Sequence, residues 1–62
     1  MFSWTYLGAS GEEIGRSHRF PDATAAEEWM GTCWPDLAEN GVEEVVLYDQ
    51  DRRMYRMGLR AE

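Results

Sequence analysis

The conventional nucleophile and base in this chain are a single cysteine and a single histidine, Cys33 and His18. A reactive cysteine needs a neighbouring base or positive charge, whereas a thiol in the apolar stripe of a helix is normally an inert small hydrophobe. Cys33 falls in such a stripe, so we expect it to be structural. Ser17 precedes His18 in an expected strand, where adjacent side chains point to opposite faces and cannot form a dyad. We therefore predict no catalytic residue and a protein that is not an enzyme.

Three adjacent carboxylate pairs, Glu12–Glu13, Glu27–Glu28 and Glu43–Glu44, raise the question of a metal site or of acid–base chemistry. None of the pairs has the spacing of a calcium-binding loop, and one histidine with one cysteine cannot complete a structural zinc site. Runs of charge usually face water. We predict no metal ligand and no cofactor, and the single cysteine leaves no internal disulfide.

Charge is segregated along the chain. All six basic residues are arginines, and none of them lies within residues 20–51, where nine carboxylates occur. The net charge of −6 disfavours nucleic acid as a partner, because such binding depends on neutralising phosphates with Lys and Arg. Arginines beside aromatic residues near the C-terminus leave a small nucleic-acid-binding module as the alternative interpretation. A small enzyme is a further alternative, disfavoured by the lack of a site.

The first half of the sheet is predicted from alternating residues. Residues 2–7 alternate with an aromatic face, and residues 13–20 read as a second strand, with Arg16 and Phe20 on one face. The glycine-containing loop between them predicts a hairpin. After the helix described next, residues 42–48 and 54–59 read as two further strands around a polar turn.

A helix is predicted between Pro21-Asp22 and Asn40-Gly41, with Gly41 in the left-handed conformation after its last turn. Either Asp22 or Thr24 can cap it, and Thr24 with Glu27 has the spacing of a capping box. Pro35 predicts either a kink or a helix that restarts there. The apolar stripe at helical spacing comprises Ala26, Trp29, Met30, Cys33, Trp34 and Leu37.

These elements predict an α+β fold, a single domain over residues 1–62 with the order β-β-α-β-β. Its four-stranded antiparallel sheet would carry one helix on one face. The last two strands carry two apolar sets. The set expected beneath the helix comprises Val45, Leu47, Tyr55, Met57 and Leu59.

The second apolar set would point to the opposite face, which one helix cannot cover. Contiguous exposed apolar residues usually mark an interaction site. We therefore predict a homodimer formed through this face or through an edge strand. The residues proposed for self-association are Val46, Tyr48, Met54 and Arg56.

Acidic residues Glu28, Asp36 and Glu39 are expected on the outer surface of the helix. Asp36 and Glu39 lie near the helix C-terminus, where carboxylates oppose the helix dipole. Such residues indicate either a surface kept acidic for solubility or a surface for a basic protein partner. No stretch approaches the ~20 apolar residues that span a bilayer, and the N-terminal residues do not resemble a signal peptide. We expect no membrane partner and a cytoplasmic location.

Several core-type residues resemble a group of small uncharacterised actinobacterial proteins over nearly the whole chain. They are Trp4-Thr5-Tyr6, Trp29-Met30-Gly31, Trp34, Leu37, Gly41-Val42, Val45 and Leu47. The group carries no assigned activity, so the resemblance implies no functional residue. The function predicted from the sequence is a non-catalytic protein-interaction or regulatory module that self-associates.

Overall fold

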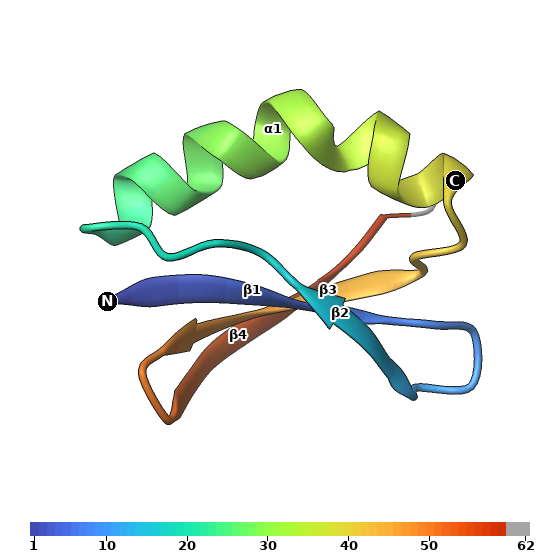
Figure 1. The fold of residues 1–62 in the computed structure, drawn as a ribbon, viewed down its shortest axis with the longest axis horizontal. Coiled ribbons are helices and arrows are strands. Elements are labelled where there is room, and N and C mark those ends of the chain that lie inside the picture. Colours follow the sequence, from blue (N-terminus) through green and yellow to red (C-terminus); the bar gives the residue numbers. More distant parts are fainter. Residues whose placement is uncertain (60–62) are drawn as a thin grey trace.

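The structure is a computed structural model, and it describes residues 1–59. Its elements follow the predicted order: β1 (Phe2–Leu7), β2 (Glu13–Arg16), α1 (Ala23–Glu39), β3 (Glu44–Asp49) and β4 (Arg52–Gly58). The four strands form one antiparallel sheet in the order β2-β1-β3-β4. The helix lies across one face of this twisted sheet (Figure 1). The predicted α+β fold is confirmed.

The core lies between α1 and the two central strands. Trp4 of β1 faces Leu47 of β3 in the register, and both are almost fully buried. Ala26 and Met30 supply the helix side of this core. The indole N–H of Trp4 donates a 2.9 Å hydrogen bond to the main-chain oxygen of Ala26, so the largest buried side chain carries no unsatisfied polar group. Trp4 thus joins sheet and helix through both packing and a directional bond.

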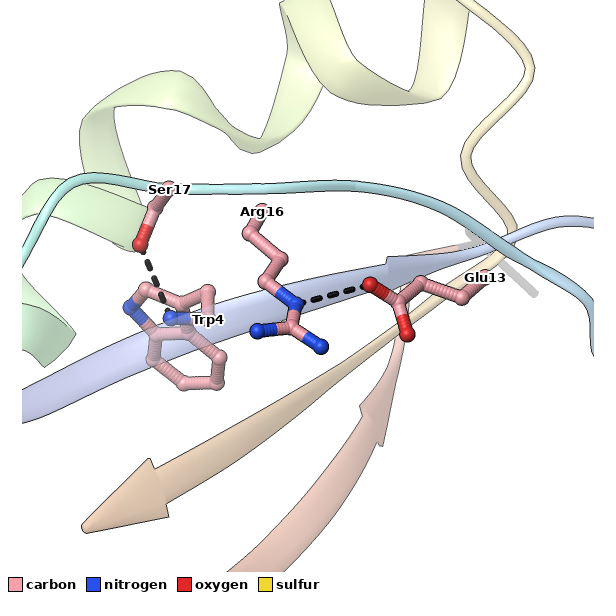
Figure 2. Close-up of polar contacts among 4 residues, drawn as sticks. All are labelled: Trp4, Glu13, Arg16 and Ser17. Carbon is pink, nitrogen blue, oxygen red and sulfur yellow. Dashed lines mark hydrogen bonds and ion pairs between the residues drawn. The ribbon is translucent and has the colours of Figure 1, made fainter. Parts of the chain in front are cut away.

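The second strand is shorter than the sequence indicates. Regular pairing ends at Arg16, because the Ser17 hydroxyl accepts the main-chain N–H of Trp4 at 2.8 Å and the ladder becomes irregular (Figure 2). Phe20 then pairs again with Phe2 as an isolated bridge. Arg16 lies opposite Thr5, and Phe20 is buried in the core. The prediction of one continuous strand over 13–20 with Arg16 and Phe20 on one face is therefore wrong.

Both ends of α1 are capped by local chemistry. Asp22 is the N-cap, with its side chain accepting the main-chain N–H of Ala25 at 2.8 Å, so the alternative cap at Thr24 is wrong. At the other end, the N–H of Gly41 bonds to the oxygen of Ala38, and the N–H of Val42 bonds to the oxygen of Leu37. This pair of bonds is a Schellman motif. The φ of Gly41 is 92°, which confirms the predicted left-handed residue.

The helix continues without a break through Pro35. The proline ring removes one intrahelical hydrogen bond and crowds the carbonyl of Gly31, four residues earlier. Gly31 lies on the exposed surface of the helix, and its missing side chain leaves open space. Of the two alternatives, a helix that restarts at Pro35 is wrong.

On β3 and β4, the side chains that are buried differ in part from those that the sequence predicts. Val45, Leu47 and Leu59 are buried on the helix side as predicted, but Tyr55 and Met57 on the same side remain 40% and 39% exposed. On the opposite side, Val46 is only 4% exposed within the single chain. Val46 is therefore wrongly assigned to an exposed apolar face, and the structure leaves further apolar surface uncovered beside the helix.

Candidate functional site

An apolar groove of about 480 Å³ runs between α1 and β4. Its wall on the helix side is formed by Gly31 and Trp34, and its wall on the sheet side by Tyr55 and Met57. The floor consists of buried core residues, among them Trp4. Trp34, Tyr55 and Met57 are each about two-fifths exposed, so the groove presents large apolar side chains to its opening.

The groove exists because one helix is narrower than the sheet beneath it. Strands lie about 4.8 Å apart, so four of them span roughly 15–19 Å, whereas a helix with its side chains is about 10–12 Å wide. Of the four strands, β1 is the one whose backbone α1 approaches. The helix-facing side of β4 is left open as a result. Covering it would require a second element beside α1, which residues 1–59 do not supply.

One polar contact spans the groove. The hydroxyl of Tyr55 donates a 2.8 Å hydrogen bond to the Glu27 carboxylate, which ties β4 to the first half of α1. Burial, followed by this hydrogen bond and the negative charge of Glu27, raises the pKa of Tyr55 to about 12. The Tyr55 ring also meets Trp4 edge to face, with centroids 6.0 Å apart. These contacts hold Tyr55 in a defined orientation at the rim.

The outer edge of β4 adjoins the groove. Within residues 1–59, β3 is the only strand that pairs with β4, so one row of its main-chain donors and acceptors faces outward. Three arginines lie on this strand: Arg52, Arg53 and Arg56. Within residues 1–59, Arg56 is the one of the three that forms an ion pair, with its Nε 3.9 Å from a Glu44 carboxylate oxygen. A bulge leaves Met54 without a partner on β3.

The face opposite the helix is mainly polar. Three of the four residues predicted for self-association are exposed or half-buried there or at the bulge, and they are Tyr48, Met54 and Arg56. Val46 is buried between its cross-strand neighbours Thr5 and Arg56. Arg16 on this face is bonded to Glu13 at 2.7 Å (Figure 2). Polar and charged side chains occupy much of this face, and Met54 at the bulge is a large apolar residue that is 45% exposed.

The candidate nucleophile and base, Cys33 and His18, lie in different segments of the chain. The His18 ring packs against Phe20, at a centroid distance of 4.3 Å, and against Trp29, at 5.5 Å. Cys33 is half-buried on α1. No hydrogen bond or ion pair of residues 1–59 links these two side chains.

The acidic residues predicted for a basic partner, Glu28, Asp36 and Glu39, are all exposed on α1. At 100° per residue they lie within about 80° of one another. That arc lies on the side of α1 away from the groove, and no arginine in the described part of the chain forms an ion pair with them. The basic partner stays a prediction for this separate surface.

In the described part of the chain, no group of three or more His, Cys, Asp or Glu residues is placed to hold a metal ion. No helix among these residues combines the length and apolar character needed to cross a bilayer. No protein-family model matches the sequence, and no curated protein or solved structure is significantly similar to it.

The groove residues Trp34, Tyr55 and Met57 escape sequence reasoning because their periodicity assigns them to covered faces. Trp34 flanks the apolar stripe of the helix, and the alternation of β4 places Tyr55 and Met57 beneath that helix. The sequence signal that could have found these residues is the number of predicted helices relative to the number of predicted strands. One helix for four strands leaves part of the covered face open as well as the whole of the opposite face.

Proposed function

We propose that this chain is a non-catalytic protein-interaction module that self-associates through the open edge of β4 and the adjoining α1–β4 groove. The observation that supports the proposal is that two kinds of uncovered surface, one apolar and one a strand edge, lie side by side. Exposed apolar side chains of Trp34, Tyr55 and Met57 lie directly beside a strand edge that no other strand within residues 1–59 pairs. Burying both kinds of surface together is what strand addition to a sheet edge achieves.

The small size of the domain supports association. Chains below about 70–80 residues bury little apolar surface, and metals, disulfides or oligomers usually supply the missing stability. The 62-residue sequence contains one cysteine, which cannot form an internal disulfide. A second copy that covers the groove would add apolar burial at about 25 cal/mol per Å² of surface removed from water.

The proposal is tested by sedimentation velocity on wild-type protein and on Met57→Glu. Met57 is 39% exposed in the groove wall, so a carboxylate there would have to be buried by a partner copy, while the isolated subunit can leave it solvated. We expect a dimer for the wild type and a monomer with unchanged circular dichroism for Met57→Glu.

A matched control is Ile14→Glu. Ile14 is an apolar residue, 48% exposed, on the other edge strand β2, so the same chemical change is made far from the groove. This variant is expected to remain dimeric. A monomeric wild type, or a dimer that Met57→Glu leaves intact, would contradict the proposal.

We also propose that the protein is cytoplasmic, since the free, half-buried Cys33 is compatible with a reducing environment. Nucleic acid is not favoured as the partner. The net charge of −6 disfavours phosphate binding, and Arg56, one of the C-terminal arginines that would contact phosphates, lies beside Glu44 of the same chain. Binding of mixed-sequence RNA or DNA at low salt would overturn this exclusion.

A further inference from the structure

The face of the sheet opposite the helix carries a polar hollow of about 570 Å³ that the proposed function does not use. Ser3 lies in this hollow and alternates with the buried Trp4, so the hollow opens away from α1. Its far wall is the turn between β3 and β4, which lies beside β1 because the main-chain N–H of Gln50 bonds to the oxygen of Met1 at 2.9 Å.

Two arginines, Arg16 and Arg19, line this hollow because the second strand is interrupted. Residues three apart in a regular strand point to opposite faces. Here the main chain leaves the ladder at Ser17, and pairing resumes at Phe20, whose side chain lies in the core. The residue before Phe20 therefore points to the face opposite the helix. Irregularities that redirect a side chain in this way are over-represented next to functional sites.

The charges of the two arginines are only partly neutralised by the chain itself. Arg16 is bonded through Nε to Glu13 at 2.7 Å (Figure 2), and its guanidinium has further N–H donors. Within residues 1–59, Arg19 forms no ion pair. Asp51 is the single carboxylate among the side chains that line the hollow. This balance of charge suits one additional negative group.

Gln50 reaches the hollow from a strained turn. Among residues 1–59 it is the one non-glycine residue with a positive φ, 59°, and it begins the two-residue turn between β3 and β4. Glycine is normally favoured at such a position because it has no Cβ. Strained residues cluster at ligand-binding sites, and the side-chain amide of Gln50 has N–H donors for an oxyanion.

We propose that this hollow binds the carboxylate group of a small, singly charged ligand. Arg16 and Arg19 supply the charged donors, since a guanidinium matches a carboxylate in geometry, and Ser3 and Gln50 supply neutral donors. A dianion would be repelled more strongly by Asp51 than a monoanion is. The same reasoning separates this ligand from nucleic acid, whose many phosphates the net charge of −6 repels.

Titration with sodium acetate tests the site, followed by nuclear magnetic resonance of the ¹⁵N-labelled protein with sodium chloride keeping the ionic strength constant. Saturable shifts are expected at the main-chain amides of Ser3, Ser17 and Gln50. Arg19→Gln should weaken acetate binding by about tenfold or more, because it removes a charged hydrogen-bond donor.

The matched control is Arg53→Gln, which makes the same change of charge on the same face. Arg53 lies opposite Tyr48 and outside the hollow, so this variant should bind acetate as the wild type does. A wild type without saturable shifts, or equal losses of affinity in the two arginine variants, would overturn the proposal.

Two further variants examine the other walls of the hollow. Asp51→Asn should bind acetate more tightly, because a repelling charge is removed. Gln50→Gly should bind acetate more weakly without a fall in melting temperature, because glycine suits the left-handed backbone. Weaker binding by Asp51→Asn, or tighter binding of sulfate than of acetate to the wild type, would overturn the assignment to a single carboxylate.

The site and the proposed self-association fail independently. Met57 lines the groove on the helix side, so Met57→Glu should bind acetate as the wild type does. Loss of acetate binding in this variant would contradict a site confined to the opposite face.

Discussion

At the scale of single residues, Trp4 shows how one side chain can organise a small domain. It is fully buried, its indole N–H bonds to Ala26 of the helix, and its ring contacts Tyr55 of the last strand. Its main chain is bonded to Ser17, whose N–H donates to the Trp4 oxygen at 2.8 Å. Three separate segments of the chain thus converge on one residue.

Ser17→Ala is predicted to destabilise the domain although it removes only one oxygen. The Ser17 hydroxyl accepts the main-chain N–H of Trp4 at 2.8 Å, and without it that part-buried donor has no partner. Leaving such a group unsatisfied costs about 1–3 kcal/mol in the free energy of unfolding. Urea unfolding measures the loss, with Ser10→Ala in the exposed loop as the control of smaller effect. Equal losses in the two variants would show that the Ser17 bond contributes nothing specific.

Tyr55 is predicted to make the domain sensitive to alkali. Its pKa in the folded state is about 12 against an ordinary value of 10.0, so the folded protein retains a proton that the unfolded chain releases. Its contribution to stability is complete below about pH 10 and is lost as the pH rises towards 12. The urea midpoint measured across this range should fall. Burial raises the pKa of Tyr6 as well, so part of the fall should persist in Tyr55→Phe.

Glu27→Gln separates the causes of the Tyr55 shift. Burial is the largest cause and remains in the variant, whereas the carboxylate acceptor and its charge are removed. The pKa of Tyr55 should therefore fall but stay above its ordinary value, as followed by phenolate absorbance. An unchanged titration would show that the 2.8 Å bond to Glu27 does not act on Tyr55.

At the scale of elements, two glycines of the helix region have opposite roles. Gly41 has a φ of 92°, whereas Gly31 lies inside α1, and an added Cβ would meet no atom within 4 Å at either position. Any effect of an added methyl group therefore comes from the backbone alone.

Gly31→Ala is predicted to raise the free energy of unfolding by about 0.5–1 kcal/mol, because alanine restricts the unfolded chain more than glycine does. Gly41→Ala is predicted to lower it by about 1–2 kcal/mol, because an L-residue is strained in the left-handed region. Thermal unfolding of the two variants gives the comparison. Shifts of the same sign would contradict the capping geometry at Gly41 or the helical geometry at Gly31.

At the scale of the whole molecule, self-association should make stability depend on concentration. A partner that binds only the folded state raises the free energy of unfolding as its concentration increases. The melting temperature of the wild type should therefore rise with protein concentration, while that of Met57→Glu should stay constant. A wild-type melting temperature that does not change with protein concentration would indicate that the groove is open in the stable form of the protein.

Much of the architecture follows from local patterns in the sequence. The alternation at Phe2, Trp4 and Tyr6 and the left-handed Gly41 each determine their own element, because they depend on residues close along the chain. The choice of Asp22 over Thr24 as the N-cap was decided by the structure. Ser17 is different. It interrupts the second strand because its hydroxyl accepts a hydrogen bond from the main-chain N–H of Trp4, and an alternating sequence pattern does not predict such a contact.

The amino-acid sequence by itself determined the order of the elements and the left-handed residue that ends the helix. The tertiary structure alone decided which apolar residues stay uncovered, moving the candidate interface from Val46 on one face to Tyr55 and Met57 beside the helix. The physical reason is that local patterns set which way a side chain points. Where a narrow helix comes to rest on a wider sheet depends on contacts between distant residues.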